Sequence, residues 1–218
     1  MGSATTVSPV MNCGHGDSSY DRNSYYQREC ANLQKGKIEE VIKEELDLKK
    51  FSSNSNTIRI ADLGCSIGPN TFIAMHDVVE AMKQKLQSQL SPSSKMFEFQ
   101  VFFNDQPPND FNTLFTSLPK ERPYFAVGVP ASFHGRFFPE SSVHFAYAAH
   151  ALNLISKAPE EPLDKKSLAW NKRRVHYTNA PKEVVDAYKR QFFEDTNNFL
   201  NAREKEIVAG GMIVLILP

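Results

Sequence analysis

The segment from Thr57 to Leu86 constrains the fold of this chain more than any other. Residues 57–63 (TIRIADL) are typical of a β-strand, and a glycine-rich turn (GCSIG) follows at 64–68. Pro69 comes next, and proline is favoured in the first turn of a helix because no backbone N–H is needed there. Apolar residues at helical spacing then continue as far as Leu86. The segment is therefore predicted to run from a strand through a tight turn directly into a helix.

Strands and helices alternate along the rest of the chain. This alternation predicts an α/β fold, a mostly parallel sheet covered by helices with right-handed crossovers. Gly210 and Gly211 are expected to end a long helix that begins near Lys182. Helices are predicted over 19–48, 111–118 and 182–208, and strands over 97–103, 124–129, 143–149 and 212–217. The long helix is expected to turn Val184, Val185, Tyr188, Phe192, Phe199 and Leu200 inward.

The last predicted strand, residues 212–217 (MIVLIL), is apolar throughout. Such a run is typical of a strand buried on both faces of a parallel sheet. An exposed edge strand of this composition promotes aggregation, so we expect the chain to be part of a longer protein that lacks its last strands here. Residues 1–18, rich in glycine, serine and asparagine, are predicted to form a flexible segment or lid, and residues 19–218 to form one ligand-binding domain.

Charge and composition narrow the classes of partner. Lys and Arg together number 25, as do Asp and Glu, so nothing favours binding to nucleic acid or to an anionic membrane surface. No apolar run approaches the roughly 20 residues of a membrane helix. The three cysteines, Cys13, Cys30 and Cys65, show no zinc-ligand spacing, which favours reduced thiols in a cytoplasmic protein. Gly2 and Thr6 match a short myristoylation pattern; a disordered tail is the alternative.

The turn after the first strand is a candidate ligand site. Gly64 and Gly68 let a ligand approach the backbone closely. Their Gly-x-x-x-Gly spacing differs from the Gly-x-Gly-x-x-Gly motif of dinucleotide-binding proteins. The turn also lacks the Lys-Ser or Lys-Thr pair of a phosphate-binding loop. A preceding acid, Asp62, suits a cofactor without phosphates, such as the cationic S-adenosylmethionine. A tight turn that binds no ligand is the competing interpretation.

Two further strand ends carry candidate residues. Asp105 ends the second strand, where an acid can bind ribose hydroxyls in doubly wound sheets; it can equally cap the following turn. Ser132 and Phe133 follow the third strand, where the phenyl ring can cover an adenine face or belong to the core. The glycine turn, Asp105 and the Ser132-Phe133 pair thus follow three successive strands, in the order that such a cofactor site requires.

These residues lie within runs that resemble the plant SABATH carboxyl methyltransferases, which have a Rossmann-like S-adenosylmethionine-binding fold. The resemblance covers residues 11–218, and the run 174–177 (RVHY) points within the family to enzymes that act on loganic acid. The matching runs also include Ser19-Tyr20, Asn23-Ser24, Gln27, 61–72 (ADLGCSIGPNTF), 103–105 (FND), 109–112 (NDFN), 128–133 (GVPASF), 136–139 (RFFP), 167–172 (SLAWNK) and 203–215.

The resemblance implies roles for particular residues. Gln27 would hold the carboxylate of the methyl acceptor through its side-chain amide, and Asn171 stands where some members have a residue near a Mg²⁺ ion. Gln106 stands where the family often has leucine. Cofactor contacts are implied at Tyr20, Ser24, Asp62, Gly64, Cys65, Asn70, Asp105, Gln106, Ser132 and Phe133.

The chain departs from the family in its acceptor-binding motif, Tyr-Ser-Leu-His-Trp-Leu-Ser. Here His150 replaces the tyrosine, Asn153 the histidine and Leu154 the tryptophan whose N–H binds the acceptor carboxylate. Leucine has no donor, so His150 or Asn153 either supplies a substitute or is merely tolerated. Family members are also longer and add a helical cap that shapes the acceptor pocket.

The resemblance implies an enzyme that methylates a small plant carboxylic acid, such as an iridoid or terpenoid acid. The acceptor carboxylate is ionised at neutral pH, so orientation rather than a general base would drive the reaction. The main alternative is an inactive cofactor-binding protein that pairs with a full-length relative, and a nicotinamide-dependent oxidoreductase is a third. A homodimer is the family expectation.

Overall fold

The computed structural model describes residues 11–12, 14, 16–51, 56–89, 96–172, 174 and 176–217. Within them, five strands form one sheet in the order β3-β2-β1-β4-β5, and every neighbouring pair is parallel. The strand reversal between β1 and β4 opens a crevice at the carboxyl edge, where ligands bind in doubly wound sheets. The strands are β1 (Thr57–Leu63), β2 (Glu98–Asp105), β3 (Phe125–Pro130), β4 (Val143–Ala149) and β5 (Ile207–Ile216).

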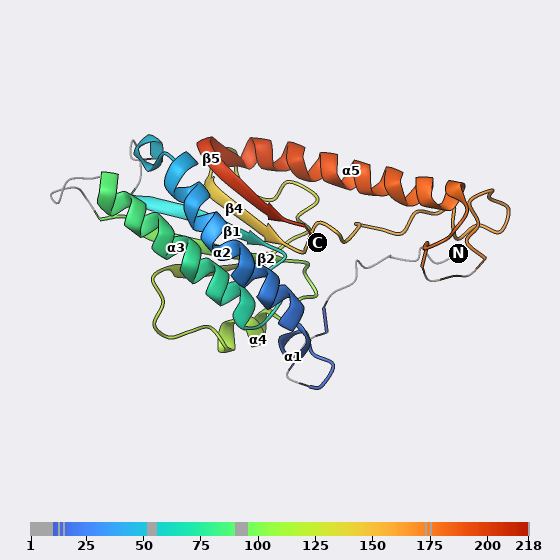
Figure 1. Cartoon of the computed structure of the whole chain (residues 1–218), viewed down its shortest axis with the longest axis horizontal. Helices are drawn as coiled ribbons and strands as arrows, with labels where there is room; N and C mark the ends of the chain where they lie inside the picture. The colour runs from blue at the N-terminus through green and yellow to red at the C-terminus, as the bar shows by residue number, and fades with distance from the viewer. Residues whose placement is uncertain are drawn as a thin grey trace.

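The helices cover the two faces of this sheet unequally. Figure 1 shows α2 and α3 side by side across one face, whereas α5 runs along β5 and extends well beyond the sheet. The helices are α1 (Tyr20–Asn23), α2 (Tyr25–Glu45), α3 (Pro69–Gln89), α4 (Phe111–Thr116) and α5 (Lys182–Glu206), with a 3-10 turn η1 at Leu48–Phe51. None of the described helices is long and apolar enough to cross a membrane.

The main core lies between the sheet and the pair α2–α3. Met75, Val79 and Met82 on α3 are fully buried against Ile58 and Ile60 of β1. Burial of each such side chain stabilises the fold by roughly 1.5–3 kcal/mol relative to exposure. A second, smaller cluster on the other face contains Phe199 of α5 with alanines of β1 and β4. The α/β prediction is confirmed, as are the exact bounds of β1 and β4.

The prediction of one continuous helix over 19–48 is wrong, because the helix is interrupted at Ser24. Ser24 has φ −96° and ψ 27°, and both its carbonyl and its hydroxyl accept hydrogen bonds from Asn70 Nδ2, at 3.2 and 2.9 Å. Ser19 caps the short α1 by accepting from Arg22 N at 3.4 Å. The break therefore fastens the N-terminal helices to the first turn of α3.

The prediction that Gly210 and Gly211 end the long helix is wrong. Helix α5 ends at Glu206, and both glycines lie inside β5. The β4–β5 register shifts between Val143 and Phe145, which makes a bulge in β5. Gly210 has φ +80°, and a Cβ on Gly211 would stand 2.9 Å from the carbonyl oxygen of His144. Here glycine permits a β-bulge, not a helix end.

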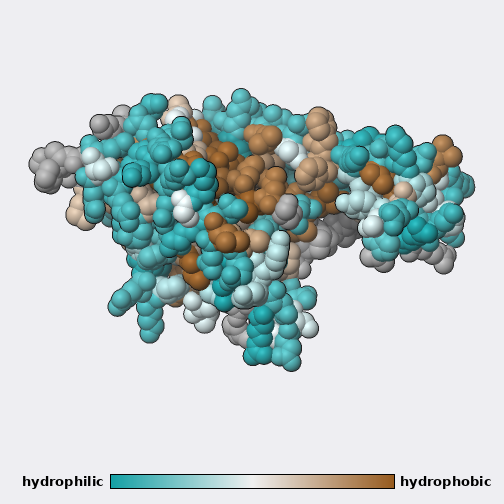
Figure 2. Space-filling model, viewed as in Figure 1, coloured by the Kyte–Doolittle hydropathy of each residue, from teal (hydrophilic) through white to brown (hydrophobic). Residues whose placement is uncertain are grey.

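The predicted inward placement of two residues of α5 is also wrong. Phe192 and Leu200 of α5 are 43% and 45% exposed, because polar residues occupy much of the inward face: Gln191, Asp195, Arg203 and Glu206 are buried. Strand β5 lies at the edge of the described sheet and is half-exposed along most of its length. Figure 2 shows apolar side chains gathered over this part of the molecule. The predicted segment 1–18 lies mostly outside the described residues.

Candidate functional site

The glycine turn after β1 is fixed to the end of β2. The backbone N–H groups of Gly64 and Cys65 both donate to the carbonyl oxygen of Asn104, at 2.8 and 3.0 Å. Gly64 has φ +82°, and a Cβ there would lie 2.5 Å from Cβ of Ala151. Only glycine fits this position, because both the backbone conformation and the space exclude a side chain.

Asp62 is a buried carboxyl group that faces the turn. It accepts a short hydrogen bond from the hydroxyl of Thr71, and no cationic side chain among the described residues pairs with it. Burial raises the pKa of Asp62 to about 7; the negative charge of Asp105 adds to this rise, and the Thr71 hydrogen bond opposes it. A positively charged ligand beside Asp62 would restore the ionised form, because an opposite charge favours ionisation.

Asp105 makes the turn-capping contacts that its sequence position allowed. Its two carboxylate oxygens accept from the N–H groups of Ser66 and Gln106, each at 2.7 Å. Burial raises the pKa of Asp105, and the two backbone hydrogen bonds oppose that rise. The residue as a whole is only partly buried. Its spare acceptor capacity is available for a ligand hydroxyl.

The loop after β3 forms the far wall of the site. Phe133 is buried, and its ring packs edge-on against Phe199 at a centroid distance of 6.3 Å. It also approaches the position that a side chain on Gly64 would take, at 3.6 Å. Gln106 Nε2 donates to the hydroxyl of Ser132 at 3.3 Å. Phe133 thus belongs to the core and lines the site at once.

Two adjoining cavities run along this edge of the sheet, and Tyr20 and Gly64 line both of them. One holds the buried carboxyl of Asp62, and the other is bordered by Asp105 and Phe133. The arrangement fits an elongated ligand with a cationic end and an aromatic end. Among the predicted cofactor residues, Asp62, Cys65 and Asn70 line the first cavity, as does the predicted acceptor residue Gln27. Gln106 lines the second cavity.

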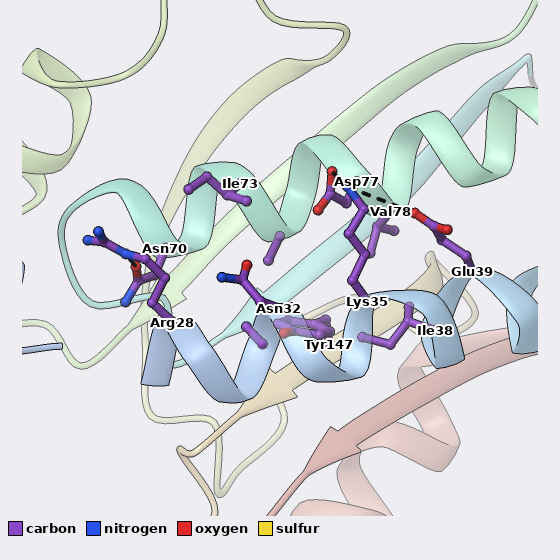
Figure 3. Close-up of a pocket in the computed structure, with 12 residues that line it drawn as sticks. Arg28, Asn32, Lys35, Ile38, Glu39, Asn70, Ile73, Asp77, Val78 and Tyr147 are labelled. Atoms are coloured by element: carbon purple, nitrogen blue, oxygen red, sulfur yellow. Dashed lines mark hydrogen bonds and ion pairs between the residues drawn. The ribbon is translucent and has the colours of Figure 1, made fainter. Parts of the chain in front are cut away.

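The N-terminal helices close the first cavity from outside. Asn70 binds Ser24, as described above, and its Oδ1 accepts from Arg28 Nε at 2.9 Å. Figure 3 shows this contact at one end of a cleft between α2 and α3, with Lys35 reaching across to Asp77 farther along. Ser24 is 1% exposed, so it contacts the cavity indirectly, through Asn70. Burial raises the pKa of the Tyr20 phenol, and its hydrogen bond with Asn70 opposes that rise.

Gln27 and His150 bring unused polar atoms to the first cavity. Both residues line it, and Gln27 Oε1 and His150 Nε2 are buried without a hydrogen-bond partner among the described residues. Burial lowers the pKa of His150 and so favours the neutral imidazole. Buried polar atoms without partners are unusual in folded proteins. They are suited to bind a polar group of a ligand.

The remaining predicted acceptor residues are separated. Leu154 lines the second cavity, whereas Asn153 is exposed and borders a different groove with Tyr177, Tyr188 and Phe192. The structure therefore does not bring Asn153 together with Gln27. We call residues 150–156 the acceptor segment, after the motif that they replace.

Asn171, predicted near a metal ion, is buried. Its Nδ2 donates to the carbonyl oxygens of Arg174 and His176, at 3.2 and 3.0 Å, and its Oδ1 has no partner among the described residues. Mg²⁺ requires about six oxygen ligands in octahedral arrangement. The described residues place no group of three or more His, Cys, Asp or Glu side chains where they could hold an ion, and the Mg²⁺ role of Asn171 stays a prediction.

Three residues that support the site were not predicted from the sequence. Thr71 binds Asp62, Asn109 Nδ2 donates to the carbonyl of Ser66 at 3.1 Å, and Asn104 Nδ2 donates to the carbonyls of Val129 and Ala131 at 2.8 and 2.9 Å. All three occur within the matching runs quoted above, which was the available signal. Their roles depend on contacts between strand ends that the sequence does not reveal.

Comparison with known proteins places this geometry in a family. Residues 6–218 match the family model of the "SAM dependent carboxyl methyltransferase". Loganic acid O-methyltransferase from Catharanthus roseus is 48% identical over 95% of this chain and 56% of its own length. Farnesoic acid carboxyl-O-methyltransferase from Arabidopsis thaliana is 44% identical over 97% of this chain and 59% of its own.

A solved structure described as "Loganic acid methyltransferase with SAH" superposes with a TM-score of 0.88 at 48% identity, over 94% of this chain and 57% of that one. The chain thus spans a little over half the length of the relatives that it matches. The family match covers nearly all of the chain, and the solved relative has the same fold. The chain belongs to the S-adenosylmethionine-dependent carboxyl methyltransferase family.

Proposed function

We propose that this chain forms the cofactor-binding part of a methyltransferase that esterifies a small carboxylic acid with the methyl group of S-adenosylmethionine. The observation that carries the proposal is the buried carboxyl of Asp62, which faces a cavity and has no cationic partner among the described residues. A buried carboxylate is costly unless a positive charge compensates it. The cationic cofactor supplies that charge together with the reactive methyl group.

The residues fit the cofactor along its length. Asp62 and the Gly64 turn hold the cationic amino-acid end, with Cys65 and Asn70 beside them, as the lining of the first cavity supports. Asp105 binds a ribose hydroxyl with its free lone pairs. Phe133 borders the adenine, Gln106 flanks it with its hydrogen-bond partner Ser132 beside it, and Tyr20 separates the two ends.

The acceptor carboxylate accepts hydrogen bonds from the side-chain N–H groups of Gln27 and His150, since both residues line the first cavity. A neutral imidazole donates through one nitrogen, which takes the place of the N–H that Leu154 lacks. The carboxylate is already ionised, so these residues act by holding the attacking oxygen in line with the methyl group. Asn153 borders the neighbouring groove and would contact only a larger acceptor.

The acceptor class that we propose is an iridoid or terpenoid acid, with loganic acid as the first candidate. The support is 48% identity to a loganic acid O-methyltransferase and 44% to a farnesoic acid enzyme. We also propose a cytoplasmic location, because Cys30 and Cys65 are free thiols. Pairing with a second copy or with a longer relative is supported by the exposed apolar residues of β5 and α5.

A second candidate function is cofactor binding without methyl transfer. It is favoured by Leu154, which lines the site and offers no donor to an acceptor.

Isothermal titration of the purified chain with S-adenosylhomocysteine tests the cofactor proposal, and micromolar binding is expected. A methylation assay with radiolabelled S-adenosylmethionine and a panel of acids, loganic acid first, then separates the two functions. Turnover supports the enzyme. Binding without turnover on any acid supports the second candidate, and absence of binding rejects both.

A further inference from the structure

The last turn of α5 contains a buried ion pair. Arg203 and Glu206 are 3% and 0% exposed, and Nη2 of the arginine lies 2.7 Å from Oε2 of the glutamate. The other ion pairs of the described residues involve at least partly exposed side chains. Removing two charges from water costs about as much as their attraction returns. A contribution to stability alone therefore does not explain why this buried pair is present. The other contacts of the two side chains indicate what it does.

Both side chains bind the backbone of one loop, residues 131–138. Arg203 donates from Nη1 to the carbonyl of Phe133 at 3.0 Å and from Nη2 to the carbonyl of Gly135 at 2.9 Å. Glu206 Oε1 accepts from the N–H groups of Phe137 and Phe138, at 2.6 and 2.9 Å. The loop thus receives four charge-assisted hydrogen bonds, which are stronger than neutral ones.

The loop needs these bonds, because it has neither helix nor strand to satisfy its buried backbone groups. The Arg203 guanidinium also lies 4.7 Å from the ring centroid of Phe137 and 5.2 Å from that of Phe199. Phe199 in turn packs against Phe133. The position of Phe133 at the wall of the second cavity is therefore set by the end of a helix that does not itself line that cavity.

We propose that Arg203 and Glu206 are positioning residues that hold the loop 131–138 in the shape that binds the adenine of the cofactor, an inference that rests on the proposed function. The pair acts through the carbonyl of Phe133 and the N–H groups of Phe137 and Phe138. Neither residue lines either cavity.

Three variants and one control test the proposal by titration with S-adenosylhomocysteine and by thermal unfolding. Arg203→Lys keeps the charge but lacks the planar fork that reaches two carbonyls, and Glu206→Gln and Arg203→Met break the ion pair. The control is Lys85→Met. Lys85 is also a buried cation bound to two carbonyls, those of Ile42 and Lys43 at 3.0 and 2.7 Å, but it lies toward the far end of α3 and lines neither cavity.

Arg203→Lys, Arg203→Met and Glu206→Gln are each expected to weaken S-adenosylhomocysteine binding at least about tenfold, the loss expected for one charged hydrogen bond. Lys85→Met is expected to lower the unfolding temperature and leave the dissociation constant within about twofold of wild type. The proposal is overturned if Arg203→Lys and Glu206→Gln bind as tightly as wild type. Equal weakening in Lys85→Met would overturn it too, because loss of stability alone would then explain the effect.

Amide hydrogen exchange separates this proposal from the proposed function. Faster exchange at Phe137 and Phe138 in Glu206→Gln, without faster exchange along β1, supports the anchoring even if wild type binds no S-adenosylhomocysteine. Unchanged exchange at both amides rejects the anchoring, whatever the wild-type affinity.

Discussion

The two parts of the candidate site, the proposed cofactor end and the proposed acceptor end, are built differently. At the cofactor end, backbone groups of Gly64, Cys65 and Ser66 are bound to Asn104 and Asp105, so the turn and the end of β2 form one unit. At the acceptor end, the acceptor segment is bound to two separate elements: to β5 by the His150 N–H, which donates to the carbonyl of Ile216 at 2.9 Å, and to α5 through Ser156 and Asp195. A preformed end can bind before the other is arranged, so the difference indicates that cofactor affinity and acceptor affinity can be changed separately.

The largest expected effect comes from Gly64→Ala. The new Cβ would collide with Ala151, and the left-handed backbone adds about 1–2 kcal/mol of strain. We expect loss of measurable S-adenosylhomocysteine binding and a large drop in the unfolding temperature. Gly36→Ala in the middle of α2 is the matched control, because a Cβ there meets no atom within 4 Å. It should stabilise the chain by up to about 1 kcal/mol.

Asp62→Asn is expected to abolish cofactor binding and yet stabilise the chain at pH 8. The folded pKa of about 7 lies above the value of an unfolded aspartate. The stabilising contribution of the protonated form is therefore complete below the unfolded pKa and lost as pH rises through 7. The gain is a few kcal/mol at pH 8 and vanishes near pH 4, as urea unfolding at the two pH values would measure. Equal stability of the two proteins at pH 8 would contradict the assignment.

The same carboxyl predicts how cofactor affinity depends on pH. A cationic ligand needs the ionised form of Asp62, so affinity for S-adenosylmethionine should fall up to about tenfold per unit as pH drops below 7. Calorimetry at pH 6 in buffers of different ionisation enthalpy should detect about one proton released per ligand bound. A flat affinity between pH 5.5 and 7.5 would rule out this linkage.

Substitutions of His150 test whether acceptor binding can be changed without changing cofactor binding. His150→Leu removes the proposed donor and should raise the acceptor KM about tenfold, with S-adenosylhomocysteine affinity unchanged within about twofold. His150→Asn is the control, because asparagine keeps an N–H donor and tolerates the left-handed backbone at this position (φ +55°). If both variants lose acceptor binding alike, the position matters for shape, not for its donor.

The smallest effect is expected from Asp195→Asn. The carboxylate accepts from the N–H and the hydroxyl of Ser156, each at 2.7 Å. Loss of its charge should cost about 1 kcal/mol and lower the unfolding temperature by roughly 2–4 °C. Scanning calorimetry measures this, and titration should show cofactor affinity like that of wild type. A large loss of cofactor affinity would mean that the two ends are coupled through α5.

Local patterns predicted the fold where neighbouring residues decide the structure. The run from Thr57 to Leu63 and the proline at 69 specified β1 and the start of α3 to the residue. The same reasoning failed at Gly210 and Gly211, because a glycine pair suits a helix end and a bulge equally well. The break at Ser24 was missed for a different reason, since its cause, Asn70, lies 46 residues away.

The candidate site divides in the same way. Asp62, Gly64 and Asp105 could be predicted because Asp62 and Asp105 lie in the last two positions of strands and Gly64 directly follows one; their cofactor roles stay predictions. Arg203 and Glu206 gave no such signal, because charged residues near the end of a helix are ordinary on a protein surface. Their burial results from packing of α5 against a loop that is distant in the sequence.

The ion pair at the end of α5 also has a consequence for the order of events during synthesis. The carbonyl of Phe133 accepts its hydrogen bond from Arg203, which is synthesised 70 residues later. At about 5–20 residues per second, a ribosome needs roughly 4–14 s to make that stretch. During this interval β1, α3 and β2 are already synthesised, whereas the loop 131–138 still lacks the side chains that anchor it. Under the proposed function, tight cofactor binding would therefore follow the synthesis of the central strands and not precede it.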